Sequence, residues 1–459
     1  MLINRTYATT DKLDNNITDE GWNVVNAGDI KGDDAKTNMP YLGGWDEDWR
    51  CVEGKFPEII FSTEGFGTGI AASTDELTAL TSLYANRSLY QGELHAHAKT
   101  YGKGQGLLQG DDGNVDLETW ANSMEGLGLD FAASLDHNQT KHYELLDKSK
   151  FVYGTEAGTT ITDATKTGNY KGELHYAMLF PDDSGLKNVL TQFNFDYSET
   201  TDLFSYKNFN RETFTNLIKT VQNDTNKGFF IHVHPTQTSY VSTDYLDEYH
   251  FVDYAGFEVF YLNTPTMDDM TEAEKQTYAQ YGAYGSVETR THYTLWTQLL
   301  NKGKRLYATS GSDTHRALNN YALTSVYSIA DAATDKGKII TQLRDGDFTA
   351  GAVGIQMRID DTKMGGHFNF KDTSRLVVNI DKFHFSDIVV STHKYRVDVI
   401  TDDGVVYRHP LTIDSSTSKP TNGKIALDVN PNSKYYRVEV VDATTGYRIA
   451  IGQPIWNDK

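Results

Sequence analysis

The middle of the chain alternates short apolar runs with stretches in which apolar residues recur every three or four positions. Helical spacing appears at Leu117, Trp120, Ala121, Met124 and Leu127, then at Phe214, Leu217, Ile218 and Val221, and again at Leu295, Trp296, Leu299 and Leu300. The apolar runs are residues 129–135, 151–153, 228–233, 256–261 and 305–309. Strands that alternate with helices are typical of a parallel sheet or barrel with crossover helices. The pattern therefore predicts an α/β unit over residues 86–351.

Beyond about residue 354 the period changes to two. Alternating stretches are separated by turn sequences such as Asp402-Asp403-Gly404, and they cover residues 375–380, 395–400, 424–429 and 435–441. This pattern predicts an all-β sandwich over residues 352–459. Residues 1–85 are rich in Gly, Asp, Asn and Thr, which indicates a small β-rich or irregular N-terminal region.

Histidines and acids follow the apolar runs of the middle region. They are His95, His97, Asp136, His137, Glu156, His175, His232, His234, Asp313 and His315. The carboxyl ends of barrel strands converge on one mouth, and residues i and i+2 share a strand face. We therefore expect His95 with His97, His232 with His234, and Asp313 with His315 to point the same way. Each motif alone is weak, but together they predict one metal site.

Composition narrows the range of functions. The 459 residues include 42 basic and 63 acidic ones, a net charge of −21, which argues against long nucleic acid as a partner. The single cysteine, Cys51, excludes an internal disulfide and a thiolate metal site, so imidazole and carboxylate ligands would favour Zn, Mn or Fe. A small anionic substrate remains compatible, because bound cations can reverse the local field.

Other features of the chain are less informative. No apolar run is long enough for a transmembrane segment. The preference for Tyr, Thr, Asn and Asp over Lys favours a secreted or cell-surface protein recorded without its leader, and leaves a cytoplasmic location open. The sequence leaves the oligomeric state open.

The order of the motifs resembles a known series. GELHAH, LDHN, GTE, ELHYAML, HVHP, FEVFYLN and SGSDTH, within residues 89–318, resemble the motifs of the PHP (polymerase and histidinol phosphatase) superfamily. The later ITQLRDGDFT and the predicted sandwich are similar to the subgroup of carbaryl-hydrolase-like metallohydrolases. The resemblance implies a distorted (β/α)7 TIM-like PHP barrel that holds two or three divalent metal ions.

The resemblance also implies a ligand set. The first ion would be held by His95, His97, Glu156 and Asp313. Glu156 would bridge to a second ion on His175 and His234, and His137 and His315 would bind the remaining ion. Many family members carry a further His or Asp soon after the first pair, whereas residues 98–103 contain neither and the next acids are Asp111 and Asp112. Both two and three ions therefore remain open.

Further roles can be assigned on chemical grounds. His232 or another pocket histidine could protonate a leaving group. The alternative is that His232 is a buried strand residue or supports a metal ligand. Asp136 is expected to orient a ligand histidine, and Glu258 to form hydrogen bonds at a strand end rather than bind metal. Lys99, Lys103 and Arg316 could clamp an anionic substrate, or could equally be solvated surface charges.

These features predict a metal-dependent hydrolase, in first place a phosphoesterase that attacks a small phosphate ester with a metal-bound hydroxide. Hydrolysis of a non-phosphate ester, carbamate or amide is the alternative. A third hypothesis is a non-catalytic cell-surface binding protein.

Overall fold

The computed structural model describes residues 70–99, 101–102, 106–107, 113–162, 173–198, 202–235, 251–261, 282–317, 322–384 and 393–458. Most of the predicted N-terminal region lies outside these residues, as do Lys103, Asp111 and Asp112. The predicted domain limits at residues 85 and 351 therefore stay predictions.

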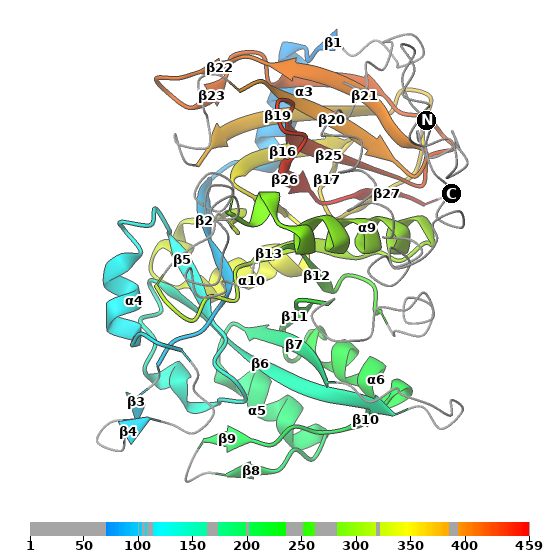
Figure 1. The fold of residues 1–459 in the computed structure, drawn as a ribbon. Coiled ribbons are helices and arrows are strands. Elements are labelled where there is room, and N and C mark those ends of the chain that lie inside the picture. Colours follow the sequence, from blue (N-terminus) through cyan, green and yellow to red (C-terminus); the bar gives the residue numbers. More distant parts are fainter. Residues whose placement is uncertain are drawn as a thin grey trace, which may run out of the picture.

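Seven strands of the middle region follow one another in a ring-like order. The strands are β2 (Arg87–Ala96), β5 (Phe131–Ser134), β6 (Phe151–Thr162), β7 (Glu173–Phe180), β11 (Phe229–His232), β12 (Gly256–Tyr261) and β13 (Tyr307–Gly311). Backbone hydrogen bonds of 2.8 Å, from Asp313 N to His95 O and from His97 N to Thr314 O, join the segment after β13 to β2. The two ends of the series, β13 and β2, thus lie side by side (Figure 1).

The strand directions depart from an all-parallel arrangement. β2, β5 and β6 are parallel, and so are β11, β12 and β13, but β7 is antiparallel to both β6 and β11. The expectation of parallel strands joined by crossover helices is wrong for β7. A direct hairpin connection reverses the chain, whereas a parallel neighbour requires a long crossover, and only residues 163–172 separate β6 from β7.

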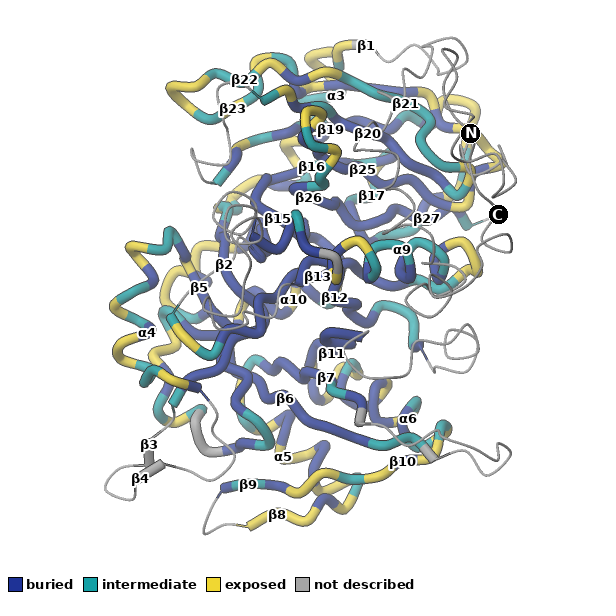
Figure 2. Tube along the Cα trace, in the orientation of Figure 1, coloured by how far each residue is buried: buried dark blue, intermediate teal, exposed yellow. Residues whose placement is uncertain are grey.

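Helices lie beside the strands of the middle region. They are α4 (Leu117–Ser123), α5 (Asp183–Gln192), α6 (Arg211–Val221), α9 (Val287–Asn301) and α10 (Ile340–Arg344). Helices α5 and α6, for example, each contain buried apolar residues. Figure 2 shows buried and exposed positions along these helices. Asp116, Asn210 and Ser286 cap the N-termini of α4, α6 and α9, because each side chain accepts a backbone N–H of the first turn. The three predicted amphipathic stretches are thus confirmed as helices.

The C-terminal strands continue the same large sheet. β14 (Thr324–Ile329) pairs with β2, and the order then runs through β15 (Phe348–Gly351), β26 (Arg448–Gly452), β25 (Tyr435–Asp442), β20 (Tyr395–Thr401) and β21 (Gly404–Leu411). A second sheet contains β1 (Ile70–Ala71), β24 (Lys424–Asp428), β19 (Arg375–Phe383), β16 (Val353–Ile359) and β17 (Thr362–Lys363). The chain is therefore a mixed α/β protein with a 16-stranded central sheet and few helices.

Short elements complete the described chain. The strands are β3 (Tyr101–Gly102), β4 (Gly106–Leu107), β8 (Tyr197–Ser198), β9 (Leu203–Phe204), β10 (Phe209–Asn210), β18 (His367–Phe368), β22 (Ile413–Asp414), β23 (Lys419–Pro420) and β27 (Ile455–Asn457). Single 3-10 turns occur at Lys141–Glu144, Gly282–Gly285, Ala330–Ala333 and Lys336–Ile339. None of the described helices is long and apolar enough to cross a bilayer.

The described end of the predicted N-terminal region contains a helix that the composition did not suggest. This helix, α3 (Thr74–Leu83), starts with a capping box in which Ser73 and Glu76 each bond the other's backbone N–H. Leu80 and Tyr84 pack against Tyr327 and Val377. The helix therefore joins the core of the rest of the protein.

Candidate metal centre

Glu156 on β6 is the centre of the histidine cluster. Its side chain is buried, with its residue 0% exposed. Oε1 lies 2.7 Å from His175 Nδ1 and 2.9 Å from His234 Nε2. Oε2 lies 3.1 Å from His95 Nε2 and 3.0 Å from His97 Nε2, with His137 Nε2 at 3.6 Å. One carboxylate therefore divides the surrounding imidazoles into two sets.

Asp313 completes the first set. Its Oδ1 lies 3.1 Å from His97 Nε2 and 3.5 Å from His95 Nε2, and the two imidazole Nε2 atoms are 3.3 Å apart. His95, near the end of β2, and His97, directly after it, thus point the same way, as their spacing predicts. His95, His97, Glu156 and Asp313 form a buried group whose donor atoms could hold a divalent metal ion.

A second group lies against the first. His137, Glu156 and His175 also present donor atoms close enough to share an ion. The structure thus brings His137 next to the carboxylate that was expected to bridge toward His175 and His234. Neither of these two groups of described residues includes His315. The Nδ1 atom of His315 lies 2.9 Å from the backbone oxygen of Asp313, and its ring stacks on that of His97 with the ring centroids 4.4 Å apart.

The electrostatics of the cluster favour a cation. Every ion-pair partner that the described residues give Glu156 is a histidine. Burial opposes ionisation of Glu156, but the charges of His137 and His95 hold the pKa of this carboxyl well below its usual range. Burial likewise opposes protonation of His97, yet hydrogen bonds to Asp313 and Glu156 raise its pKa to about 10. Buried carboxylates thus require positive charge, from protons or from metal ions.

The end of β12 supports this cluster with two side chains. Glu258 Oε1 lies 2.9 Å from His95 Nδ1, and its Oε2 accepts the His234 backbone N–H at 2.6 Å. Tyr261 donates its hydroxyl to Asp313 Oδ2 at 2.9 Å. The β12–β13 register shifts between Glu258 and Phe260, and such a bulge lets positions three apart face the same site. Glu258 therefore forms hydrogen bonds as expected, but from within β12 rather than from its end.

Backbone geometry is unusual where strands enter the cluster. His234, Asp313 and Asn138 have φ values of 26°, 52° and 58°. Residues other than glycine seldom adopt this left-handed region, and the cost is about 1–2 kcal/mol each. The turn at His234 also corrects one expectation: β11 ends at His232, so His232 and His234 do not share a strand face.

His232 lies among aromatic rings. Its ring centroid is 5.0 Å from that of Phe230 and 4.9 Å from that of Phe251, and burial lowers its pKa to about 3. A neutral imidazole in these surroundings favours the interpretation as a buried strand residue over that of a proton donor.

Asp136 holds the main chain of the site. The residue is fully buried, and its Oδ1 accepts the Ala98 backbone N–H at 2.7 Å, directly after His97. This bond therefore fixes the path of the chain beyond the end of β2, directly after the His95–His97 pair. A role in orienting a ligand histidine remains a proposal.

The expected substrate clamps differ in their surroundings. Arg316 is exposed, and Lys99 is half-buried, with a backbone bond from its N–H to Val115 O. Lys103 lies outside the described residues. The clamp role therefore stays a prediction for Lys99 and Arg316.

Two residues near the cluster were not expected from the sequence. Tyr261 occurs within an apolar run and looks like an ordinary core residue. Glu93 is fully buried, and its Oε1 accepts backbone N–H groups of His95 and Ser312 at 3.1 and 2.8 Å. Burial raises its pKa to about 7. Its signal is the spacing of residues 93, 95 and 97, which in a regular strand would put all three side chains on one face.

Comparison with known proteins does not assign this chain to a family. No protein-family model and no curated protein matches the chain. Among solved structures, a lesion-specific endonuclease from Pyrococcus furiosus is 15% identical, with a TM-score of 0.30, over 55% of this chain and 56% of that one. A protein described as a metal-dependent phosphoesterase, from Bifidobacterium adolescentis, is 14% identical with a TM-score of 0.29, over 49% and 87%.

A third structure is similar to the same degree. It is an amidohydrolase from Chromobacterium violaceum, 12% identical with a TM-score of 0.27, over 49% of this chain and 87% of that one. This chain therefore covers 56% of the length of the first of these structures and most of the other two. TM-scores below 0.5 do not establish a shared fold. The function of this chain is therefore inferred from the residues of the site.

Proposed function

We propose that the chain is a metal-dependent hydrolase of the PHP superfamily. The observation that carries the proposal is the buried Glu156 carboxylate, whose two oxygens lie within hydrogen-bonding distance of separate sets of imidazoles. A carboxylate in this position can be shared between two cations. Motifs from distant parts of the chain supply the surrounding ligands, as the resemblance implies.

The donor set fits divalent ions. His95, His97, Glu156 and Asp313 would hold one ion. His175 and His234 lie at the other oxygen of Glu156, and His137 forms a second candidate group with Glu156 and His175. Imidazole nitrogen combined with carboxylate oxygen suits Zn, Mn or Fe better than Ca. When bound, such ions lower the pKa of a bound water and stabilise charge that develops on a phosphoryl or acyl oxygen.

The protein's own residues prepare the site for that chemistry. Glu258 fixes the Nδ1 side of His95, so that Nε2 faces the cluster. Tyr261 orients Asp313 in the same way. The enclosed cluster keeps bulk water away from its carboxylates, which strengthens their electrostatic interactions. These contacts place the ligands before any substrate arrives.

The strand order is compatible with the fold that the resemblance implies. We infer that β2, β5, β6, β7, β11, β12 and β13 form a distorted barrel whose carboxyl-end loops hold the site. The backbone bonds between β2 and the segment after β13 support this inference. We further infer that the C-terminal part of the central sheet and the second sheet form the sandwich. Packing between them, for example of Phe383 against Tyr395, supports this arrangement.

The substrate class is proposed to be a small phosphate ester. Bound cations would make the pocket of an otherwise acidic protein attractive to an anion, and Lys99 and Arg316 lie on segments that lead out of the cluster. The alternative is hydrolysis of a neutral ester, carbamate or amide, on which the same ions could act by polarising the carbonyl group.

A substrate panel tests the proposal. The purified protein, supplied in turn with Mn and Zn, is assayed on a phosphate monoester, a phosphate diester and a carboxyl ester of the same chromophore. Phosphate ester turnover that a chelator abolishes and added metal restores supports the proposal. Turnover of the carboxyl ester alone rejects the phosphoesterase function. Inactivity of the metal-loaded protein on all three esters counts against a hydrolase.

A further inference from the structure

A cavity on the other side of β12 lies apart from the metal cluster. It has a volume of about 60 Å³ and lies between the start of α9 and the turn that leads into β26. Phe260 lines it, whereas the next residue, Tyr261, bonds to Asp313 in the cluster. Successive strand residues point to opposite faces, so the strand itself separates the two sites.

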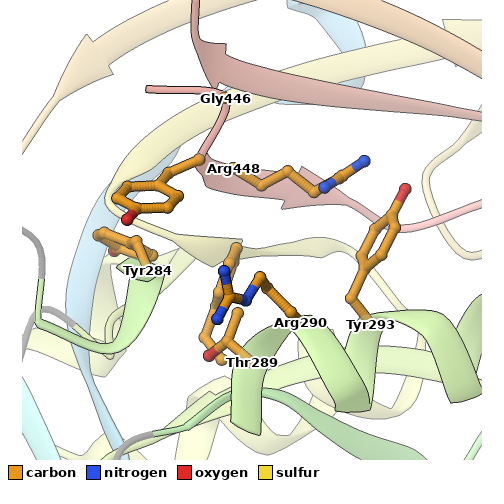
Figure 3. Close-up of a pocket in the computed structure, with 8 residues that line it drawn as sticks. Tyr284, Thr289, Arg290, Tyr293, Gly446 and Arg448 are labelled. Carbon is orange, nitrogen blue, oxygen red and sulfur yellow. The ribbon is translucent and has the colours of Figure 1, made fainter. Parts of the chain in front are cut away.

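The lining of the cavity is rich in groups that can donate hydrogen bonds to an anion. Arg290 and Tyr293 come from α9, Tyr284 precedes this helix, and Tyr447 and Arg448 come from the opposite side. Figure 3 shows the Arg290 guanidinium beside α9 toward Tyr284, while Arg448 extends above the helix toward Tyr293. The carboxylates Glu439 and Asp398 are close by but do not line the cavity.

Both carboxylate oxygens of Glu439 already accept hydrogen bonds from neighbouring side chains. Its Oε1 accepts from Arg437 Nε at 2.9 Å and from the Tyr293 hydroxyl at 2.7 Å, and its Oε2 accepts from Arg448 Nε at 2.7 Å. The Arg448 guanidinium also lies 3.8 Å from the centre of the Tyr293 ring. The single negative charge of Glu439 thus faces the two positive charges of Arg437 and Arg448. Their sum leaves a surplus of positive charge beside the cavity.

On the neighbouring strands β20 and β21, a second single carboxylate, Asp398, also lies close to two arginines. Asp398 Oδ1 lies 2.7 Å from Arg396 Nε and 3.3 Å from Arg408 Nε. Burial lowers the pKa of Arg408, and the like charges of Arg396 and Arg448 act in the same direction despite Asp398. The arginines of this sheet are therefore close enough to repel one another.

Arg290 adds a further cation at the mouth of the cavity. It is exposed, and no carboxylate among the described residues pairs with it. The whole chain carries a net charge of −21, so this group of arginines is an exception on an acidic protein. Such local clusters recruit anions, and arginine suits the planar or tetrahedral oxygens of carboxylates and phosphates.

We propose that this cavity binds the carboxylate or phosphate group of a small anionic ligand. One water molecule needs about 10–15 Å³ of cavity volume. The cavity therefore has room for roughly four atoms of that size, which is comparable to one carboxylate or phosphate group. Arg290 provides the free charge, and the Arg448 guanidinium, which lines the same cavity, provides additional N–H donors. The remainder of the ligand extends outward past Arg290, which is exposed.

Calorimetric titration of the full chain tests the site. Inorganic phosphate and acetate are titrated separately at constant ionic strength, with chloride as the reference salt. The comparison of the two anions decides whether the ligand group is phosphate or carboxylate. We expect saturable binding of at least one anion, and we expect Arg290→Gln to weaken it about tenfold, the usual effect of losing one charge-assisted hydrogen bond.

A control variant and a chelator separate this site from its surroundings. Lys302→Gln removes the same charge from the far end of α9 and is expected to bind the anion like the wild type. The titrations are repeated with a chelator present, and only anion binding that persists is assigned to the cavity, so the result does not depend on the proposed hydrolase function. Absence of saturable binding in the presence of the chelator overturns the proposal. So does equal affinity of Arg290→Gln and wild type.

Discussion

His95 and Glu258 form a buried pair in which the imidazole Nδ1 and a carboxylate oxygen are 2.9 Å apart. The pair fixes which imidazole nitrogen faces the cluster, because the Nδ1 proton is directed to Glu258. Glu258 also accepts the His234 backbone N–H, so it positions two of the candidate ligand segments at once. It is therefore the supporting residue whose change should affect metal binding most selectively.

Glu258→Gln is expected to lower metal affinity about 10- to 100-fold while the protein still folds, since second-layer carboxylates commonly have this effect. Competition of the purified variant with a chromophoric chelator measures the affinity. Glu288→Gln, an exposed carboxylate in the first turn of α9, is the matched control. Wild-type affinity in Glu258→Gln would show that His95 does not need its carboxylate partner.

Tyr261→Phe removes the hydroxyl that bonds to Asp313 Oδ2 and leaves the ring in place. One hydrogen bond to a charged group contributes about 1.5–3 kcal/mol, so we expect metal affinity to fall roughly tenfold or more. Tyr407→Phe, on half-buried β21, provides the comparison. If the two variants bind metal equally well, Asp313 is held by its histidine neighbours alone.

His232→Phe tests the buried-strand interpretation through pH. Burial lowers the pKa of His232 to about 3, whereas the ordinary value is 6.5. Between these values the unfolded state binds the proton and the folded state does not, so stability falls as pH falls from 6.5 toward 3, by about 1.4 kcal/mol per pH unit for this group. Urea unfolding at several pH values should show a shallower dependence for His232→Phe. An unchanged slope would mean that His232 is protonated in the folded protein.

Arg316→Gln tests the substrate clamp. Because the side chain is exposed, removing its charge should raise KM for a phosphate monoester only about two- to fivefold, with kcat and the KM of a neutral ester unchanged. Lys99→Gln should act in the same direction. Steady-state kinetics on both substrate types provide the test, with Lys302→Gln as the control. Equal effects on charged and neutral substrates would argue against a charge clamp.

The sequence predicts the local elements of the site well and their directions less well. The His95–His97 pair points to one place because a strand imposes a period of two, and this can be read from the spacing alone. The same reasoning fails for His232 and His234, because a left-handed turn follows the strand. The antiparallel direction of β7 also escaped prediction, since an apolar run carries no signal of its direction.

Contacts made through tertiary structure were harder to foresee. Tyr261 lies in the run FEVFYLN, where a bulge rather than simple alternation brings it and Glu258 to the same site. The predicted boundary near residue 351 follows a change in pattern, but the backbone ladder continues across it, because β15 pairs with β26. Neither the bulge nor the ladder has a signature in composition or periodicity.

The metal content of the folded protein tests the account most directly. Wild type and Glu156→Gln are incubated with Zn, Mn and Fe, freed of excess metal and analysed by mass spectrometry for bound ions, with circular dichroism as the check of folding. We predict two or three ions per wild-type chain and a clear loss of bound metal in Glu156→Gln. A folded wild-type protein that retains no metal would contradict the account.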